Sequence, residues 1–277
     1  MEHVIFGPIA APDLHVMTFN VRRELPWTPR RPDRWRARRP LLQHLLRTER
    51  PSVLGVQEAM PDQTATIVEA LGAEYAFIGR GRERGGRGEA CPLFYDTERL
   101  ELLGWQQIAL SDTPSVAGSR SWGNPLPRMY VEATLRDRAT SVEFVAINTH
   151  LDPFSARSRV RAAETLRRRV AEQHLPCLVT GDFNARAGSP ALRTLLSADG
   201  LRDAWTAARS RVTPEWGSHP GYRPPRIGAS RIDWIVVGPE ITVERAAVNA
   251  RSVDGAWPSD HLPVQAVVRM PAKGTTP

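Results

Sequence analysis

The sequence predicts a mixed α/β fold in which one domain takes up nearly the whole chain. Short apolar runs of strand type alternate with segments whose apolar residues recur at helical spacing. The 277 residues suit one large domain or two small ones, and a hydrophobic fraction of 41% is enough for a sizeable core. Polar residues that end these runs extend from Asn20 to His261 and must converge from both ends of the chain, which favours one domain. We therefore expect a lead-in over 1–13, one domain over 14–270 and a flexible tail over 271–277.

The first half of the chain is expected to hold helices and short strands in alternation. Apolar residues at helical spacing predict a helix that Asp33 caps and that ends near Glu49, with Pro40 either kinking it or marking its start. The unbroken apolar run Val53–Gln57 is typical of a strand buried on both faces. The other expected elements are a loop over Arg22–Pro32, a helix over Asp62–Leu71, strands over Leu14–Asn20 and Tyr75–Gly79, and a pair of strands, Leu93–Tyr95 with Leu100–Trp105.

The stretch Arg80–Gly88 has low complexity, because it contains only arginine, glycine and one glutamate. It predicts a mobile loop, which is either the solvated tip of a hairpin or a dedicated contact to nucleic acid. A second long loop, rich in Ser, Gly and Pro, is expected over 111–127.

A second run of strands is expected in the second half of the chain. Two runs of strands, each followed by helical segments, indicate two sheets packed face to face with helices outside, although the pattern alone establishes only a mixed α/β fold. The expected elements are strands over Tyr130–Leu135, Val142–Asn148, Ile232–Val237, Ile241–Val248 and Val264–Arg269, a basic helix over Ala156–Gln173 and a short helix over Pro190–Ser197.

Polar side chains recur at the ends of the apolar runs. They are amides, carboxylates and an imidazole, and they belong to Asn20, Glu58, His150, Asp182 and Asn184. A strand without a function has no reason to end this way each time. Polar residues gathered at one rim of a sheet are the expected form of a site built on a rigid scaffold.

A further carboxylate and a His-carboxylate pair come from the C-terminal part of the chain. Asp233 begins an apolar strand, and Asp260 and His261 lie in a turn between two prolines. One carboxylate can orient the imidazole for proton transfer, and a second can hold a hard cation. The alternative is that Asp260 caps the turn and His261 packs beneath it.

Taken in order, these segments resemble the endonuclease/exonuclease/phosphatase superfamily from Leu14 to about Arg269. This group includes pancreatic deoxyribonuclease, the abasic-site exonucleases, neutral sphingomyelinases, inositol polyphosphate phosphatases and the deadenylases. The loop around Trp122 resembles a bacterial branch near the deadenylase-like members. The resemblance implies a four-layered α/β sandwich, with two packed mixed β-sheets flanked by helices.

The resemblance also implies a metal site. Glu58 would be the main ligand, helped by Asn20 and Asp260. Oxygen ligands without a thiolate cluster suit Mg²⁺ or Mn²⁺ better than zinc, and Mg²⁺ keeps several waters, so few protein ligands suffice. The alternatives are that Asn20 is a turn residue at a strand end and that Glu58 is a helix cap or a surface charge.

The family pattern assigns the acid–base work to residues that follow the later strands. His261, oriented by Asp233, would be the general base on the attacking water or a donor that stabilises the transition state. Asp182 would align or deprotonate that water, or hold a second metal. Asn184 would donate to a phosphoryl oxygen.

Three further residues match the pattern less sharply. His150 matches the second histidine of the deoxyribonuclease and sphingomyelinase branches, which would donate to a phosphoryl or leaving oxygen. Glu89 aligns with the carboxylate that orients this histidine in the deoxyribonuclease, and its alternative is a loop carboxylate paired with an arginine. Arg128 resembles an arginine that faces the substrate phosphate, and its alternative is a salt bridge at the rim.

The expected function is divalent-metal-dependent hydrolysis of phosphate esters, with the phosphodiesters of DNA or RNA as the first choice of substrate. The net charge of +7, the pI near 10.3 and the basic helix Ala156–Gln173 favour a polyanion, although arginine makes up all of the basic residues except Lys273 and this bias also fits a GC-rich genome. The alternatives are a phosphatase or phosphodiesterase of small-molecule or lipid esters, and a catalytically inactive binding protein of the same fold.

The cysteines, the hydropathy of the chain and the remaining histidines give further expectations. Cys91 and Cys177 are expected as buried free thiols, without a disulfide framework or zinc site. Without a run of 18 apolar residues or a basic n-region, we expect no transmembrane helix or signal peptide, and hence a cytoplasmic protein. We also expect a monomer. The histidines without a matched partner are expected on the surface or in packing, with only His219 a candidate for lining a cleft: His3, His15, His44, His174 and His219.

Overall fold

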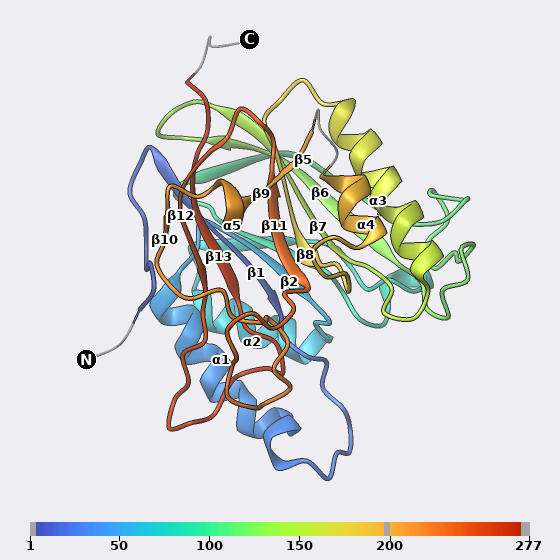
Figure 1. Ribbon diagram of the computed structural model, residues 1–277, viewed down its shortest axis with the longest axis vertical. Coiled ribbons are helices and arrows are strands. Elements are labelled where there is room, and N and C mark those ends of the chain that lie inside the picture. The colour runs from blue at the N-terminus through green and yellow to red at the C-terminus, as the bar shows by residue number, and fades with distance from the viewer. Residues whose placement is uncertain (1–3, 197–199, 273–277) are drawn as a thin grey trace.

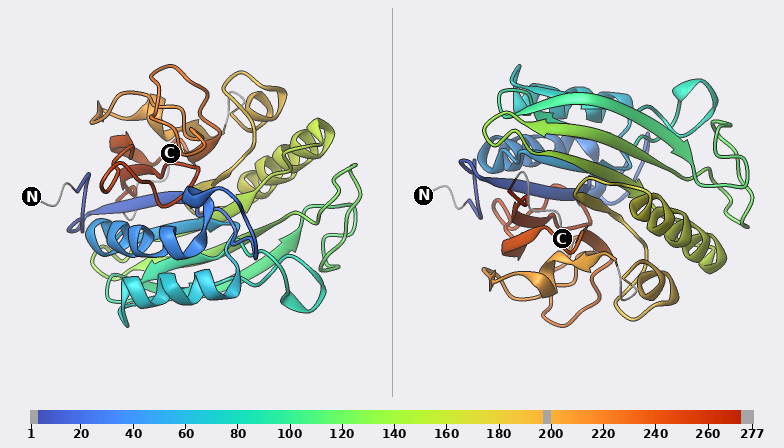
Figure 2. Two further views of the ribbon diagram at one scale, coloured as in Figure 1. Left: turned by 90° about the horizontal axis from the view of Figure 1, so that it is seen from below. Right: turned by 90° about the horizontal axis from the view of Figure 1, so that it is seen from above.

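The computed structural model describes residues 4–196 and 200–272 and folds them into two stacked β-sheets with helices on the outside. One sheet has seven strands in the order β10-β12-β13-β1-β2-β4-β3, and the other has six in the order β5-β6-β7-β8-β11-β9. In Figure 1, α1 and α2 lie at the lower left of the strands and α3 and α4 at the right, and Figure 2 shows the same separation from two further directions. The α/β sandwich expected from the sequence is confirmed.

The elements have the following bounds. The seven-stranded sheet contains β1 (Asp13–Asn20), β2 (Val53–Gln57), β3 (Tyr75–Ile78), β4 (Leu93–Asp96), β10 (Ser210–Arg211), β12 (Thr242–Val248) and β13 (Val264–Arg269). The six-stranded sheet contains β5 (Leu100–Ala109), β6 (Met129–Asp137), β7 (Glu143–His150), β8 (Cys177–Asp182), β9 (Arg202–Asp203) and β11 (Asp233–Val237). The α-helices are α1 (Trp35–Glu49), α2 (Pro61–Leu71), α3 (Ala156–Ala171), α4 (Pro190–Leu195) and α5 (Ala204–Ala207).

Apolar side chains fill three layers between these elements. Leu42 and Leu46 are spaced one turn apart on α1, so both face the outer side of the seven-stranded sheet. Ala162 and Leu166 do the same for α3 on the six-stranded sheet. The third layer lies between the sheets, where strands of both contribute fully buried side chains such as that of Phe144.

A buried polar network joins the two sheets beneath the site described below. Gln57 Nε2 donates to Asn148 Oδ1 at 2.7 Å, and Asn148 Nδ2 donates to the carbonyl oxygen of Val56 at 2.8 Å. Thr180 Oγ1 donates to the same Asn148 oxygen at 3.1 Å. A Cβ atom at Gly55 would collide with Thr180 Oγ1, so only glycine allows the sheets to approach this closely. Because buried polar groups need partners, this network favours a single register between the sheets.

The strand registers bring the two ends of the chain together. β1 pairs with β2 in parallel and with β13 in antiparallel, so the first and last predicted motifs lie in one sheet. β7 pairs with β8 in parallel, with His150 opposite Asp182, and β11 pairs with β8 in antiparallel, with Asp233 opposite Asp182. This arrangement supports one domain over 14–270, which stays a prediction.

The start of α1 differs from the expectation. Arg34, not Asp33, is the N-cap, and no side chain caps the helix. A short 3₁₀ turn precedes α1 and directs the Asp33 carboxylate to Arg22 Nε at 3.3 Å and to the hydroxyl of Tyr222 at 3.0 Å. Pro40 lies inside α1, which therefore starts before it.

The expected pairing of Leu93–Tyr95 with Leu100–Trp105 is wrong. β4 pairs with β2 and β3, whereas β5 pairs with β6 in the other sheet. The burial of the strands gives the reason. β4 is nearly all buried and suits an inner position, whereas β5 is half exposed and forms an edge. Strand propensity does not reveal which partner a strand chooses.

The low-complexity stretch forms a hairpin. Arg82 N donates to the carbonyl oxygen of Glu89 at 2.9 Å, and residues 83–87 are exposed at the tip. The solvated tip is therefore confirmed for these residues, but the side chain of Arg82 turns inward and is buried.

Both ends of the chain were expected to be loose. At the N-terminal end, the amides of residues 5–7 donate to the Glu49 carboxylate, and at the other end 273–277 lie outside the described residues.

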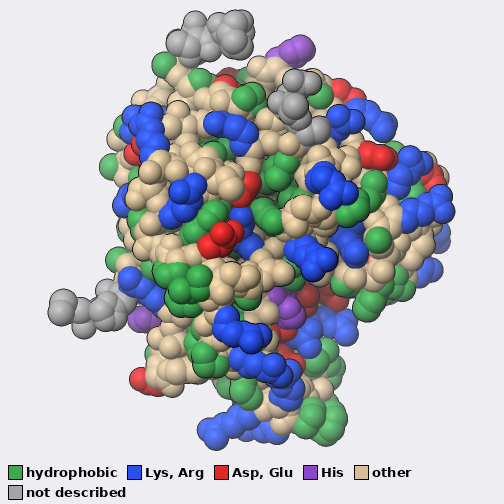
Figure 3. All heavy atoms as spheres, in the orientation of Figure 1, with side chains coloured by type: hydrophobic (Ala, Val, Ile, Leu, Met, Phe, Trp, Pro, Cys, Tyr) green, Lys and Arg blue, Asp and Glu red, His purple; other side chains and the backbone are tan. Residues whose placement is uncertain are grey.

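The arginines of α3 are largely occupied by neighbouring oxygen atoms. Arg159 donates to the carbonyl oxygen of Asp152, Arg161 pairs with Glu164, and Arg169 pairs with Glu132. Figure 3 shows Lys and Arg side chains spread over the viewed face.

Cys91 and Cys177 are buried and free, as expected, and no helix in the described part of the chain is long and apolar enough to cross a membrane.

Candidate active site

Residues that follow four strands meet at one rim of the sandwich. Asn20 ends β1, and its Nδ2 donates to Glu58 Oε1 at 3.0 Å and to Asp182 Oδ2 at 2.9 Å. His150 ends β7, and its Nε2 lies 3.5 Å from the same Asp182 oxygen. One amide therefore connects a carboxylate beyond the seven-stranded sheet with a carboxylate of the six-stranded sheet.

Two of the gathered residues have a strained backbone. Glu58 has φ 62° immediately after β2, and Asn184 has φ 47° just after β8. Such left-handed conformations cost on the order of 1–3 kcal/mol for a residue with a side chain, and they cluster at functional sites. Asn184 Nδ2 donates to the carbonyl oxygen of Leu151 at 2.9 Å, which leaves the second amide hydrogen for another acceptor.

A buried carboxylate holds the imidazole of His261. Nδ1 of His261 lies 2.9 Å from Asp233 Oδ2 and 3.2 Å from Oδ1, and Asp233 is wholly buried. The Ser218 hydroxyl donates to Asp233 at 2.6 Å and accepts the Asp233 amide at 3.1 Å. With Nδ1 committed to Asp233, Nε2 of His261 faces Asp182 at 3.8 Å.

The charges around His261 and Asp182 shift both pKa values. Burial alone would lower the pKa of His261, but the Asp233 and Asp182 carboxylates outweigh it and raise the pKa to about 10. Burial, followed by the charge of Asp233, raises the pKa of Asp182 to about 7. The imidazole is therefore set to be a cation at neutral pH, and the neighbouring carboxyl group titrates there.

Asp260 lies on the other side of His261, beside His219. His219 Nε2 is 3.6 Å from Asp260 Oδ2, and the two imidazole rings are 4.4 Å apart. Burial would raise the pKa of Asp260, but the contact with His219 and the charges of His261 and Arg22 hold it well below its usual range. His219 therefore lines the site, whereas surface or packing was the main expectation for it.

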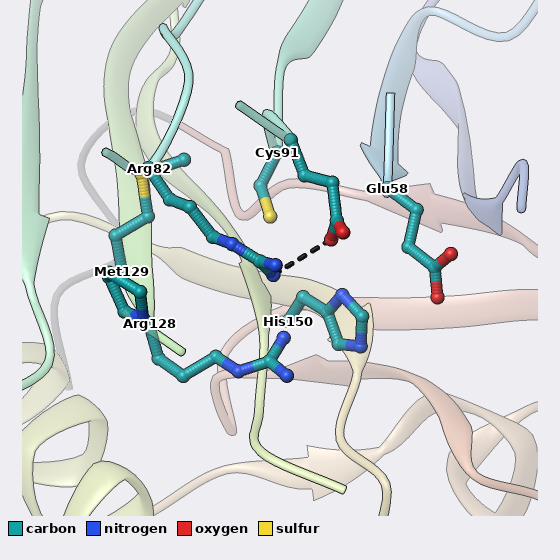
Figure 4. Close-up of a pocket in the computed structure, with 8 residues that line it drawn as sticks. Glu58, Arg82, Cys91, Arg128, Met129 and His150 are labelled. Atoms are coloured by element: carbon teal, nitrogen blue, oxygen red, sulfur yellow. Dashed lines mark ion pairs between the residues drawn. The ribbon is translucent and has the colours of Figure 1, made fainter. Parts of the chain in front are cut away.

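A pocket opens beside His150 and Glu58 (Figure 4). Two of its lining residues are Arg82 and Glu89, which form an ion pair at 2.7 Å. The other Glu89 oxygen accepts from Arg23 at 3.1 Å. This is the arginine-paired alternative for Glu89, and its role as the group that orients His150 stays a prediction.

Arg128 reaches the same pocket from the six-stranded sheet. It is only 4% exposed, and its Nε forms a buried salt bridge with Asp152 at 3.2 Å, while its role of facing the substrate phosphate stays a prediction. In Figure 4 its guanidinium group points toward His150. Burial together with Arg128 and Arg82 holds the pKa of His150 well below its usual range, so this imidazole is neutral and can donate one N–H.

The donor set suits a hard divalent cation. Glu58 and Asp260 offer carboxylate oxygens, and the Asn20 amide lies beside Glu58. Two His–Asp groupings also have ligand atoms within reach of one ion, namely Asp182, Asp233 and His261, and His219, Asp260 and His261. Arg22 Nε lies 3.7 Å from Asp260 and supplies positive charge to these carboxylates. The oxygen-rich composition is typical of Mg²⁺ or Mn²⁺ sites.

Sequence reasoning missed three residues that support the site. Arg82 was one of several arginines in a low-complexity stretch, and nothing in its composition distinguishes it. Ser218 and Asp152 carry no motif, although Asp152 follows His150 by two positions, and a polar residue so close to a strand end could have been noticed.

Comparison with known proteins identifies the family. The model of the Endonuclease/Exonuclease/phosphatase family matches residues 17–261. A family protein from Bacteroides thetaiotaomicron has 29% identity and a TM-score of 0.87, with 93% of this chain and 98% of that chain covered. A mannosyl-6-phosphatase of the same organism has 30% identity and a TM-score of 0.84, with 92% and 99% covered.

A curated relative adds a more distant match. Protein angel of Drosophila melanogaster is 28% identical over 174 residues, which are 59% of this chain and 47% of the relative. The chain thus spans about half the length of the curated relative it matches. Members of the family are phosphoester hydrolases that generally depend on a divalent metal. The chain belongs to the endonuclease/exonuclease/phosphatase family.

Proposed function

We propose that the protein hydrolyses a phosphate ester by attack of a water molecule, assisted by Mg²⁺ or Mn²⁺, at the rim where the two sheets meet. The observation that carries this proposal is the chain of polar contacts from Asp233 through His261, Asp182 and Asn20 to Glu58. It connects an acid–base pair to a candidate metal ligand through three hydrogen bonds and one charge contact of 3.8 Å between His261 and Asp182.

The metal would be held by Glu58 and Asp260, with Asn20 beside them. A bound divalent cation polarises the phosphoryl group and screens its negative charge. Asn20 Oδ1 accepts the amide of Arg22 at 2.9 Å, which fixes the plane of its side chain between the carboxylates. Asn20 therefore orients the carboxylates as well as serving as a candidate ligand.

The charges favour one division of labour between Asp182 and His261. A carboxyl group with a pKa of about 7 suits a general base that accepts a proton from water near neutral pH. An imidazole with a pKa of about 10 suits a donor to a phosphoryl oxygen in the transition state. Of the two roles expected for His261, the donor is thus favoured. Neutral His150 and the spare hydrogen of Asn184 add further donors.

Two substrate classes are candidates, namely nucleic acid and a small phosphate ester. The net charge of +7 supports nucleic acid, but the pairing of Arg159, Arg161 and Arg169 with oxygen atoms of the chain itself weakens the case for α3 as its binding surface. A small phosphate ester is the second candidate. It is favoured because a relative with 30% identity, aligned over 99% of its length, is a mannosyl-6-phosphatase.

A chelation experiment tests the proposed reaction. Protein freed of metal by a chelator should be inactive on a panel of phosphomonoesters and phosphodiesters, including DNA and RNA, and should recover on addition of Mg²⁺ or Mn²⁺. Addition of Ca²⁺ at the same concentration controls for ionic strength and non-specific charge. Undiminished turnover of any of these substrates in excess chelator would reject metal assistance.

A further inference from the structure

The pocket beside His150 contains hydrogen-bond donors that the described protein atoms do not use. Arg82 and Arg128 are 8% and 4% exposed, yet Arg82 Nε and Arg128 Nη1 have no hydrogen-bond partner among the described residues. Buried N–H groups are nearly always paired, and each unpaired one costs stability. Two such groups on the wall of one pocket indicate that an acceptor from outside the chain belongs there.

The charges in this pocket point to an anion. Glu89 is shared by Arg82 at 2.7 Å and Arg23 at 3.1 Å, and Asp152 pairs with Arg128 at 3.2 Å. Glu58 also lines the pocket, so three guanidinium groups face three carboxylates and the protein charges balance; a divalent cation held at Glu58, as proposed above, would leave the pocket positive. Arginine donors match phosphoryl oxygens in geometry and charge.

The wall of the pocket away from Glu58 is closed. Cys91, Pro127 and Met129 complete the lining, and Cys91 and Met129 are 6% and 4% exposed. Burial raises the pKa of the Cys91 thiol to about 12, so it stays neutral and adds no charge. A group bound against this wall can carry a substituent on its open side only.

Resting on the function proposed above, we propose that this pocket receives the terminal phosphate of a phosphomonoester and that Arg82 is a specificity-determining residue for it. A phosphomonoester presents three non-bridging oxygens, whereas a phosphodiester presents two and has a second ester arm. Such an arm would run into Cys91 and Met129. The unused donors of Arg82 and Arg128 fit the third oxygen, beyond those that His150 and the metal region can serve.

The reaction balances for this substrate. The water oxygen forms a bond to phosphorus, the bond between phosphorus and the ester oxygen breaks, and that oxygen keeps the electron pair and gains a proton. The products are an alcohol and inorganic phosphate. The phosphate group could come from a sugar phosphate or from the phosphorylated end of an oligonucleotide, because both present the same terminal group.

A matched pair of substrates tests the inference. p-Nitrophenyl phosphate and bis(p-nitrophenyl) phosphate share a leaving group and differ by one ester arm. With Mg²⁺, the wild type should have the higher kcat/KM on the monoester. Arg82→Gln should lose about 10- to 100-fold on the monoester, the effect of one charged hydrogen bond, and less on the diester. Arg87→Gln, at the exposed tip of the same hairpin, should change neither.

A binding measurement separates the pocket from the chemistry. Inorganic phosphate should raise the melting temperature of the wild type and of Arg87→Gln, but not of Arg82→Gln. Arg82→Lys keeps the charge without the planar fork, and it replaces Arg82→Gln if circular dichroism shows that the latter is unfolded. Mannose 6-phosphate and an oligonucleotide with a 3′-phosphate then distinguish the two sources of the group.

The outcomes separate the two proposals. If the wild type prefers the diester, or if the Arg82 variants lose activity equally on both substrates, the inference about the pocket is wrong while the hydrolytic function stands. If neither substrate class is hydrolysed with metal, the proposed function fails, and phosphate binding that depends on Arg82 decides on the pocket alone. Phosphate stabilisation that persists in both Arg82 variants would overturn the inference.

Discussion

Replacing Asp233 with asparagine removes one charge from the site with almost no change of shape. The wild-type carboxylate is wholly buried, contacts His261 Nδ1 at 2.9 Å and accepts the Ser218 hydroxyl at 2.6 Å. Both donors share Asp233 Oδ2, which an amide oxygen can replace, but Asp233→Asn removes the charge and places an NH₂ group where Oδ1 lies 3.2 Å from His261 Nδ1. We expect the imidazole to lose its preferred protonation state and its orientation.

The pKa shift of His261 gives the free energy by which its surroundings favour the protonated imidazole. Its rise from 6.5 to about 10 corresponds to about 5 kcal/mol in favour of the protonated imidazole. Asp233 is the largest of the charges that cause this rise, and burial opposes it. Without Asp233 the pKa of the imidazole should fall, because the opposing effect of burial remains. Loss of a positioned acid–base group lowers kcat by roughly 10²–10⁴-fold.

The assay has two readouts. The first is kcat on a phosphomonoester at saturating metal, with Asp62→Asn on the exposed start of α2 as the control. The second is the titration of the histidine side chains by NMR in metal-free protein, where the His261 proton should leave at a much lower pH in Asp233→Asn. An Asp233→Asn variant with wild-type kcat and an unchanged His261 titration would refute the role assigned to this pair.

The same shift has a consequence for stability. The folded pKa of His261 is raised, so between pH 6.5 and about 10 the folded protein keeps a proton that the unfolded chain releases. The stabilisation is therefore complete below pH 6.5 and is lost as the pH rises toward 10. Asp233→Asn should show a smaller fall of the free energy of unfolding over this interval, measured by urea denaturation.

Three further predictions concern stability and the basic surface. Burial lowers the pKa of His15 to about 4, so the unfolded chain takes up a proton first, and about 3 kcal/mol of stability should be lost as the pH falls from 6.5 to 4. In urea denaturation, His15→Leu should lack this part of the dependence of the free energy of unfolding on pH. An identical dependence in the variant and the wild type would contradict the prediction. Gly55→Ala should cost about 1–3 kcal/mol, because its Cβ collides with Thr180, and an unchanged melting temperature would refute the close approach of the sheets. The double variant Arg157→Ser, Arg168→Ser removes exposed charge from α3. If α3 binds nucleic acid, the slope of log affinity against log salt should fall by up to about 0.9 per lost contact. An unchanged slope for both DNA and RNA would exclude α3 as the binding surface.

Sequence reasoning located most of the candidate site because the strand registers preserve it. β1 and β2 run in parallel in one sheet, as do β7 and β8 in the other, so the residues that end each pair lie at one edge of their sheet. The stacking of the two sheets then brings these edges together, as the Asn20–Asp182 hydrogen bond shows. Asp233 begins its strand, but β11 runs antiparallel to β8, which places Asp233 opposite Asp182. A polar residue at the end of an apolar run can therefore be identified as a candidate site residue from the sequence.

The features that sequence reasoning missed depend on contacts between distant segments. Arg82 is buried because its hairpin pairs it with Glu89, and composition does not tell it from the exposed Arg87. His219 contacts His261 because two loops fold against each other, and no local pattern encodes that contact. Similarly, local propensity gave β4 and β5 as strands but not the sheets they join.

In the proposed reaction, hydrolysis at this rim depends on a divalent cation held by Glu58. The most direct test is the Mg²⁺ dependence of turnover in Glu58→Gln, with Glu98→Gln on an exposed turn as the control. Removing a partner of a metal ligand costs 10–100-fold in metal affinity, so removing the ligand itself should raise the required Mg²⁺ concentration at least about 100-fold. Glu98→Gln should match the wild type. Wild-type turnover by Glu58→Gln at the same Mg²⁺ concentration would contradict the role of Glu58 as the metal ligand.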